Sequence, residues 1–256
     1  MGRLALQHIE CFHLILLSLL ARRIDRAGWV VKGGVNLRAW FGSRRYSEDL
    51  DIDAVRGQPH VLEEKVDKLL ESRPFVDLLA TQALSLARSS KPKQTETTQR
   101  WKFEIHAHKF PVPLHTRVEF SRRGSREEEY VLEPVRPEIV RPYGLLAPTV
   151  YHYTARSAVR QKIQALVSRA ETQARDVWDL DHLLRTIGAD ARPLPAVLRR
   201  TLDEAIARVT ALSFDVFKAQ IVPYLTAADQ ELYGTPDAWA RMCELVAGRL
   251  AELKDV

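Results

Sequence analysis

The chain has 256 residues, 46% of them hydrophobic, and a net charge of +5 with a pI near 9.3. This length suits one large domain or two small ones, and the apolar content excludes a globally disordered chain. The two cysteines, Cys11 and Cys243, have no metal-ligand spacing, so we interpret both as reduced core thiols of a cytoplasmic protein.

The first predicted element is a helix in a strongly apolar N-terminal segment. Residues 14–20 resemble the hydrophobic core of a signal peptide, but His8, Glu10 and His13 interrupt the segment before them and no small-residue cleavage site follows. The apolar run is also far shorter than the ~20 residues of a membrane span. We therefore expect an amphipathic helix over residues 4–27 and no contact with a membrane.

A glycine pair follows a short apolar strand predicted over residues 29–31. Lys32, Gly33 and Gly34 form a turn that leads into a helix over residues 35–40. Glycine has no Cβ, so the backbone can approach a ligand closely, and the free N–H groups at a helix start bind phosphate oxygens. The turn is therefore a candidate phosphate site, although paired glycines at such a junction are often only a steric requirement.

A polar loop over residues 42–45 precedes a strand predicted over residues 49–55. Its acids occupy alternate positions, so Asp49, Asp51 and Asp53 share one face. Like charges this close are costly unless a cation lies between them, and Mg²⁺ is usually held by one or two carboxylates and substrate phosphates. The strand alone could be an edge that shows acids to solvent. Together with the glycine turn that precedes it in the sequence, the acidic strand predicts nucleotidyl or phosphoryl transfer at a metal.

The following segment contains one helix and several strands. A helix is predicted over residues 60–72. Residues 74–90 are ambiguous, because residues 75–79 could extend a helix and residues 83–87 could form a strand. Residues 89–99 have no large apolar side chain, so we expect a loop there. Strands are predicted over residues 101–107, 115–121 and 130–135.

Beyond about residue 150 all the predicted elements are amphipathic helices. They cover residues 156–168, 175–185, 196–212, 214–224 and 238–253. We therefore expect an α/β protein, with a small mixed-sheet domain over residues 1–150 and a helical domain over residues 151–256.

The motifs resemble the minimal nucleotidyltransferase core of the DNA polymerase β-like superfamily. Two longer phrases are similar to AbiEii/AbiGii-type nucleotidyltransferase toxins, and together they cover about residues 28–185. The first is Lys-Gly-Gly-Val-Asn-Leu at 32–37, followed by Arg-Tyr-Ser-Glu-Asp-Leu-Asp at 45–51. The second is Lys-Ile-Gln-Ala-Leu at 162–166, Arg169, and then Ala-Arg-Asp-Val-Trp-Asp-Leu at 174–180.

The resemblance implies a metal site on the acidic strand. Asp49 and Asp51 would ligate Mg²⁺ or Mn²⁺, and Asp53 could replace one of them because it continues the alternation. Superfamily members often add a third acid from a neighbouring strand, for which Glu119 is the first candidate and Glu104 the second. The alternative for Glu119 is a surface acid paired with an arginine.

The nucleotide contacts are assigned by the same resemblance. They are Gly33, Gly34, Ser47 and Lys162. A lysine over the triphosphate neutralises charge that develops in phosphoryl transfer. Asp176 would orient Lys162 or act on the attacking hydroxyl, and both would complete a catalytic set with Asp49 and Asp51. The alternative for Lys162 and Asp176 is an interhelical ion pair on a solvated surface.

The implied function is that of a toxin that transfers NMP from an NTP to an RNA acceptor, expected to be a tRNA 3′ end, and arrests growth. A cognate antitoxin is implied as well, and the helical domain is expected to close the nucleotide cleft. The basic net charge is compatible with a nucleic acid partner. The alternatives are a small-molecule nucleotidyltransferase of the antibiotic-modifying kind and a non-catalytic nucleic-acid-binding module.

Overall fold

The computed structural model describes residues 2–108, 110–124, 128–187, 194 and 196–254. The chain divides into two compact units. The sheet unit comprises Leu4–Gly42 and Tyr46–Tyr153, and the helical unit comprises Met1–Arg3, the loop Ser43–Arg45 and Thr154–Val256. A mixed sheet followed by helices confirms the expected α/β class.

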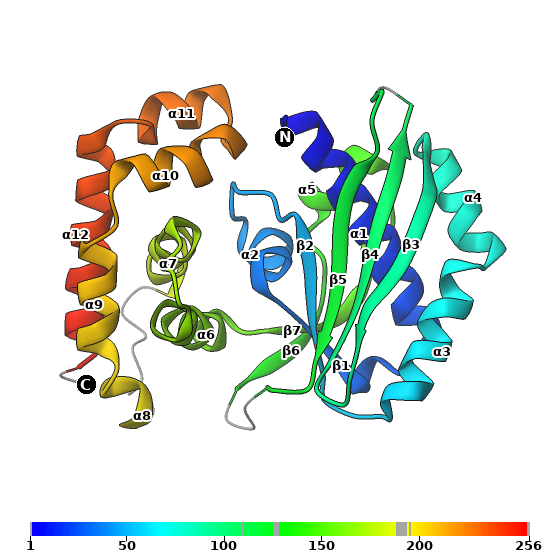
Figure 1. Cartoon of the computed structure of the whole chain (residues 1–256), viewed down its shortest axis with the longest axis horizontal. Coiled ribbons are helices and arrows are strands. Elements are labelled where there is room, and N and C mark those ends of the chain that lie inside the picture. Colours follow the sequence, from blue (N-terminus) through cyan, green and yellow to red (C-terminus); the bar gives the residue numbers. More distant parts are fainter. Residues whose placement is uncertain (1, 109, 125–127, 188–193, 195, 255–256) are drawn as a thin grey trace. The chain divides into compact units, whose positions relative to one another are not determined.

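The sheet unit is built on one sheet, to which seven strands of the described residues contribute. They are β1 (Trp29–Lys32), β2 (Asp49–Ala54), β3 (Leu84–Gln94), β4 (Thr98–Ala107), β5 (Leu114–Ser121), β6 (Tyr130–Pro134) and β7 (Thr149–Tyr153). Their order is β3-β4-β5-β2-β1-β7-β6 (Figure 1). The β1–β7 and β2–β5 pairs are parallel and the other pairs are antiparallel. The acidic strand β2 lies between β1 and β5, which are distant from each other in the sequence.

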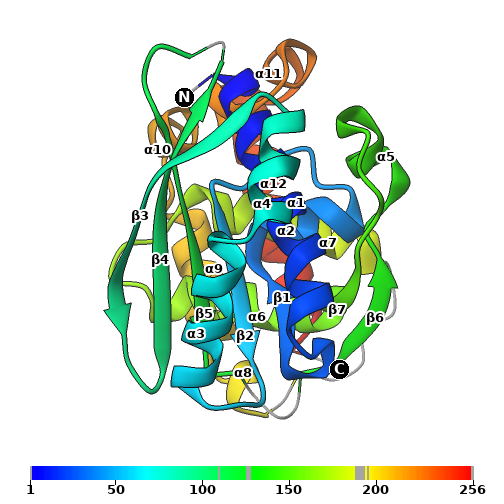
Figure 2. The same ribbon diagram turned by 90° about the vertical axis from the view of Figure 1, so that its right-hand side faces the viewer.

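The helices of the sheet unit bury one face of this sheet. They are α1 (Arg3–Arg23), α2 (Gly33–Phe41), α3 (Pro59–Leu70), α4 (Arg73–Thr81) and α5 (Pro137–Val140), with short 3₁₀ turns at Arg26–Gly28 and Arg141–Tyr143. The helices α1, α3 and α4 lie on the same side of strands β3 to β5 (Figure 2). Their apolar residues join the inward-facing side chains of the strands in one core cluster.

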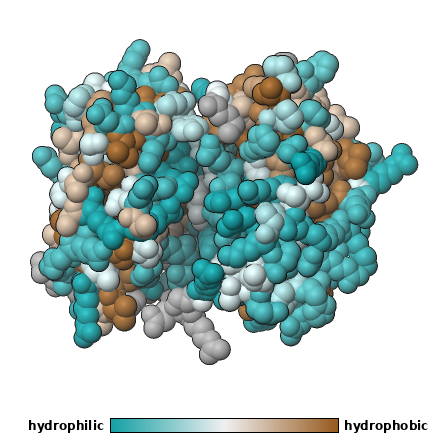
Figure 3. Space-filling model, viewed as in Figure 1, coloured by the Kyte–Doolittle hydropathy of each residue, from teal (hydrophilic) through white to brown (hydrophobic). Residues whose placement is uncertain are grey.

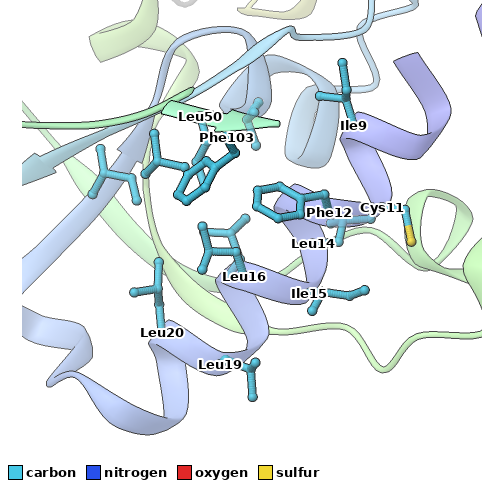
Figure 4. Close-up of a cluster of buried hydrophobic side chains, with 14 of the residues drawn as sticks. Ile9, Cys11, Phe12, Leu14, Ile15, Leu16, Leu19, Leu20, Leu50 and Phe103 are labelled. Atoms are coloured by element: carbon cyan, nitrogen blue, oxygen red, sulfur yellow. The ribbon is translucent and has the colours of Figure 1, made fainter. Parts of the chain in front are cut away.

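The apolar N-terminal segment is the central helix of this core. Phe12 and Leu16 of α1 face Phe103 of β4 and Leu50 of β2 (Figure 4). By length and composition α1 could cross a membrane, yet 72% of its most apolar window is buried within the protein. Burial against the sheet therefore accounts for the run that resembles a signal peptide.

The predicted loop over residues 89–99 is wrong. β3 continues to Gln94 and β4 starts at Thr98, so only a tight turn separates them. β3 is an edge strand in which residues 87–92 are all exposed. It therefore lacks the alternation of apolar and polar residues by which a half-buried strand is detected in a sequence. The strand β7 also escaped prediction.

The helical unit contains the other described helices. They are α6 (Ala155–Ser168), α7 (Ala174–Ile187), α8 (Ala196–Arg199), α9 (Leu202–Thr210), α10 (Phe214–Gln220), α11 (Ala227–Tyr233) and α12 (Pro236–Glu252), with a 3₁₀ turn at Val222–Tyr224. The single helix expected over residues 196–212 is interrupted, because the Thr201 hydroxyl donates to the Leu198 carbonyl and competes with helical hydrogen bonding. Stacked rings of Trp178, Phe217 and Trp239 fill the centre of this unit.

Candidate active site

The strand β2 separates apolar from acidic side chains. Leu50 and Ile52 are fully buried in the core, so the alternate residues Asp49, Asp51 and Asp53 project from the opposite face of the sheet. Hydrophobic burial of the even-numbered residues thus fixes the direction of the three carboxylates.

Asp53 is the most deeply buried of the three acids, and its carboxylate is paired within the protein. It is 2% exposed, its Oδ1 lies 2.5 Å from Lys32 Nζ, and its Oδ2 accepts a 2.8 Å hydrogen bond from the Tyr153 hydroxyl. Burial of Tyr153, together with the Asp53 charge, raises the pKa of this hydroxyl well above its usual value. Tyr153 therefore stays a donor, and both oxygens of Asp53 have partners.

The other two acids differ from Asp53 and from each other. Asp49 forms an ion pair with Arg117 of β5, at 2.9 Å between Oδ2 and Nη2. Asp51 lies between Lys32 of β1 and Glu119 of β5 in the sheet register, yet within the described residues its carboxylate has no hydrogen bond or ion pair. Asp51 is therefore the acid whose charge is left uncompensated.

The glycine turn lies directly against Asp51. Gly33 has φ +70°, and a Cβ at this position would stand 2.9 Å from Asp51 Oδ2. The helix α2 begins at Gly33, with Gly34 as its second residue, so its first N–H groups start beside the free carboxylate. A side chain at residue 33 would fill the space next to Asp51, which explains the need for glycine here.

The third acid predicted for the site is present but paired. Glu119 is the register neighbour of Asp51, and Arg100 of β4 binds it at 2.7 Å through Nε and 2.5 Å through Nη2. Glu104 is instead opposite His115, in a row of the sheet that does not include the β2 acids. The structure therefore brings Glu119 to Asp51 and leaves Glu104 away from it.

Ser47 holds the backbone that enters β2. Its hydroxyl donates a 2.8 Å hydrogen bond to the carbonyl oxygen of Asp49. Ser47 thus supports the acidic strand from its start, and a contact with nucleotide would require this hydroxyl to find a second partner.

The second predicted pair, Lys162 and Asp176, belongs to a buried ionic cluster in the helical unit. Lys162 Nζ lies 3.1 Å from Asp176 Oδ1 and 2.7 Å from Asp179 Oδ2, and both aspartate side chains are fully buried. Arg169 pairs with Asp176 at 3.2 Å, and Arg45 of the loop pairs with Asp179 at 2.9 Å. The pair is therefore not on a solvated surface.

Electrostatics holds Asp179 ionised within this cluster. Burial alone would raise the pKa of its carboxyl, but the charges and hydrogen bonds of Arg45 and Lys162 outweigh burial and keep the pKa well below its usual value. Three cations surround two carboxylates, so the cluster has compensated its own acids.

Comparison with known proteins identifies the family of the chain. The sequence profile described as the nucleotidyl transferase AbiEii toxin of type IV toxin-antitoxin systems matches residues 14–244. The chain belongs to the AbiEii toxin family. The chain is therefore a nucleotidyl transferase and the toxin of a type IV toxin-antitoxin system, with an NTP substrate and a cognate antitoxin implied by that class.

Solved structures share the fold. A Helicobacter pylori protein described as a candidate nucleotidyltransferase matches with a TM-score of 0.62 and 19% identity, over 99% of both chains. The Helicobacter pylori protein JHP933 matches with a TM-score of 0.61 and 18% identity, over 100% of this chain and 97% of its own. No curated protein matches the sequence.

The donor set of this AbiEii-family chain fits a metal that arrives with a nucleotide. No group of three acids, histidines or cysteines in the described part of the chain could hold a metal ion by itself. Asp49 and Asp51 nevertheless offer carboxylates on one face, one of them uncompensated, beside the start of α2. Mg²⁺ typically takes one or two carboxylates and completes its shell with substrate phosphates and water.

Three members of the ionic cluster are not among the predicted site residues, namely Arg45, Arg169 and Asp179. Arg169 and Asp179 lie in the second family phrase, and Arg45 starts the acidic motif. Arg45 and Asp179 are 134 residues apart, so no local spacing relates them. The signal that was available is the Arg-Asp-x-x-Asp phrase, which puts two acids on adjacent turns of α7.

Proposed function

We propose that this AbiEii-family toxin transfers a nucleoside monophosphate from an NTP to the 3′ end of an RNA, expected to be a tRNA, and thereby arrests growth in the cytoplasm. The observation that supports this most is Asp51, which has no partner among the described residues and lies beside Gly33 at the start of α2. An acid without a partner is costly unless a cation completes the site, and a helix start without side chains favours a phosphate.

The chain's own residues supply binding and orientation. The first N–H groups of α2 donate to the phosphate oxygens, and Gly33 keeps the space beside Asp51 open. Asp49 and Asp51 would hold the metal, and Asp49 would have to exchange its Arg117 partner for the ion. When bound, Mg²⁺ or Mn²⁺ neutralises the phosphates and favours the deprotonated form of the attacking hydroxyl.

The transfer exchanges a phosphoanhydride bond of the NTP for a phosphodiester bond to the acceptor. The acceptor hydroxyl oxygen forms a bond to the α-phosphorus of the NTP, and the bond from that phosphorus to the bridging oxygen breaks. The hydroxyl proton passes to a carboxylate or to water, and pyrophosphate leaves with the negative charge. Glu119, the neighbour of Asp51, is placed to join the metal site only if it releases Arg100.

The proposal includes the roles that the family resemblance gives to Lys162, as a contact for the triphosphate, and to Asp176, as the acid that orients this lysine. Because Lys162 is bound by Asp176 and Asp179, contact with a triphosphate requires its amine to exchange one carboxylate for phosphate oxygens. Asp176 would then orient the lysine rather than take part in chemistry.

The test is incubation of purified protein with Mg²⁺, each labelled NTP in turn and total RNA. We expect label on tRNA, and no label on RNA with Asp51→Asn protein of unchanged fold. Label transferred only to a small molecule in a cell extract would support the antibiotic-modifying alternative. Absence of label on any acceptor, together with salt-sensitive RNA binding, would support a non-catalytic binding module.

A further inference from the structure

The acidic face of β2 continues into a basic face across the neighbouring strands. Residues paired in the register of a sheet share a face, so the pairings define rows across it. One row runs through Lys93, Arg100, Glu119 and Asp51, on β3, β4, β5 and β2. The charge therefore changes from positive at the sheet edge to negative at the proposed catalytic strand.

A second row has the same polarity. It runs through Ser90, Lys102, Arg117 and Asp49, again from β3 to β2. We call Lys93, Arg100, Lys102 and Arg117 the cation rows. With strands ~4.8 Å apart, the lysine on β4 is roughly 10 Å from β2 and the one on β3 roughly 15 Å.

Two members of the cation rows keep their charge free for a ligand. Arg100 and Arg117 are paired with Glu119 and Asp49, but Lys93 and Lys102 have no acid partner among the described residues. Lys102 is exposed on the strand whose alternate residues, Trp101 and Phe103, are 1% exposed. The same strand thus faces the core on one side and solvent on the other.

The opposite face of these strands is committed to folding. The helices α1, α3 and α4 cover it, and most of the surface of the sheet unit in Figure 3 is hydrophilic. No described acid pairs with Lys93 or Lys102, and unpaired lysines on one face repel one another. A polyanion would relieve that repulsion, since phosphate oxygens are the usual partners of such side chains.

We infer that the cation rows bind the phosphate backbone of the RNA acceptor, with its 3′ end at Asp51. This inference rests on the proposed function and adds the acceptor surface to it. The backbone would cross β4 and β5 toward β2, so that the terminal hydroxyl reaches the acids while the preceding phosphates lie on Lys93 and Lys102. Such contacts do not read bases, so this surface gives affinity and direction rather than sequence preference.

The test is the salt dependence of RNA binding, measured by fluorescence anisotropy with a labelled tRNA and without NTP. The double variant Lys93→Gln/Lys102→Gln removes charge without disturbing a pair that the structure records. For a single strand the slope of log K against log[salt] is about −0.7 for each phosphate contact, so the double variant should lose roughly 1.4 from the slope. Its KM for tRNA should rise while kcat at saturating tRNA stays the same.

Lys65→Gln is the matched control. Lys65 is exposed on α3, which covers the other face of the sheet, so its loss changes net charge without touching the cation rows. A wild-type slope in the double variant, or an equal loss in Lys65→Gln, would overturn the inference. Because binding is measured without NTP, a protein that binds RNA through the cation rows but transfers no nucleotide would refute the proposed function alone.

Discussion

Asp51 of the sheet unit and the two buried aspartates of the helical unit have opposite electrostatic states. In the sheet unit, Asp51 is half-buried beside an open helix start and has no partner among the described residues. In the helical unit, Asp176 and Asp179 are fully buried and bound by Lys162, Arg169 and Arg45. Asp51 therefore has a charge that no described residue compensates, whereas Asp176 and Asp179 have cationic partners within the helical unit. The contrast is between an acid that is available to bind a cation and acids whose charges are already compensated.

The largest effect should come from Asp51→Asn. We expect nucleotidyl transfer to fall about 10³-fold, because the carboxylate that shares the metal with the nucleotide is lost. Thermal stability should stay the same or rise slightly, since no described residue depends on the Asp51 charge. Transfer kinetics and a thermal melt on the same preparation check this. An unfolded variant would contradict the claim that the fold does not depend on the charge of Asp51.

The opposite outcome is expected for Asp179→Asn. The change leaves Arg45 and Lys162 buried with less compensating charge, so the free energy of unfolding should drop by about 3 kcal/mol. Glu204→Gln on α9 is the control, because Glu204 is exposed and its ion pair with the half-buried Arg208 should be worth at most about 0.5 kcal/mol. Urea denaturation measures both, and equal effects would remove the distinction between a buried cluster and surface pairs.

The pH dependence of that stability difference has a definite sign. The pKa of Asp179 is depressed in the folded state, so its contribution is fully present above the unfolded value of about 3.9 and is lost as pH falls below it. The gap between wild type and Asp179→Asn should therefore be constant from pH 7 to about pH 5 and shrink in more acidic solution. A gap that widens on acidification would contradict the assigned charges.

Gly33→Ala should have a smaller effect on stability and a selective effect on activity. Its positive φ is strained for alanine and the new Cβ would lie 2.9 Å from Asp51 Oδ2, so we expect about 1–2 kcal/mol of destabilisation and weaker NTP binding. Gly57→Ala is the matched control, because Gly57 has φ +90° but no atom near its Cβ position. Gly57→Ala should lose similar stability and keep NTP affinity. Loss of affinity in both variants would show that the effect is general strain.

The acidic strand could be predicted from the sequence because the pattern that marks it is local. Period-two alternation puts Asp49, Asp51 and Asp53 on one face, and the preceding glycines mark the helix start. The different states of these acids could not be predicted, because they depend on β5 and β7, which are distant in sequence. Arg117 compensates Asp49 only through the parallel β2–β5 pairing, and Tyr153 reaches Asp53 from a strand that the pattern did not reveal.

The helical unit shows the same limit. The Lys162 and Asp176 phrases were visible as motifs, and their helices were predicted within a residue or two. Their burial was not, because it depends on Arg45, a loop residue that precedes β2 in the chain and pairs with Asp179 in the fold. Charge compensation of this kind depends on tertiary packing. The spacing of residues within one helix therefore does not predict which cation will pair with a buried acid.

The most direct test of the account is titration calorimetry of wild type and Asp51→Asn with Mg²⁺, with a non-hydrolysable NTP analogue, and with both. We expect that Mg²⁺ alone produces no saturable binding and that Mg²⁺ strengthens analogue binding to wild type. We expect this Mg²⁺-dependent gain in analogue affinity to disappear in Asp51→Asn. An Asp51→Asn protein with the same Mg²⁺-dependent gain would contradict the claim that Asp51 completes a shared metal–nucleotide site.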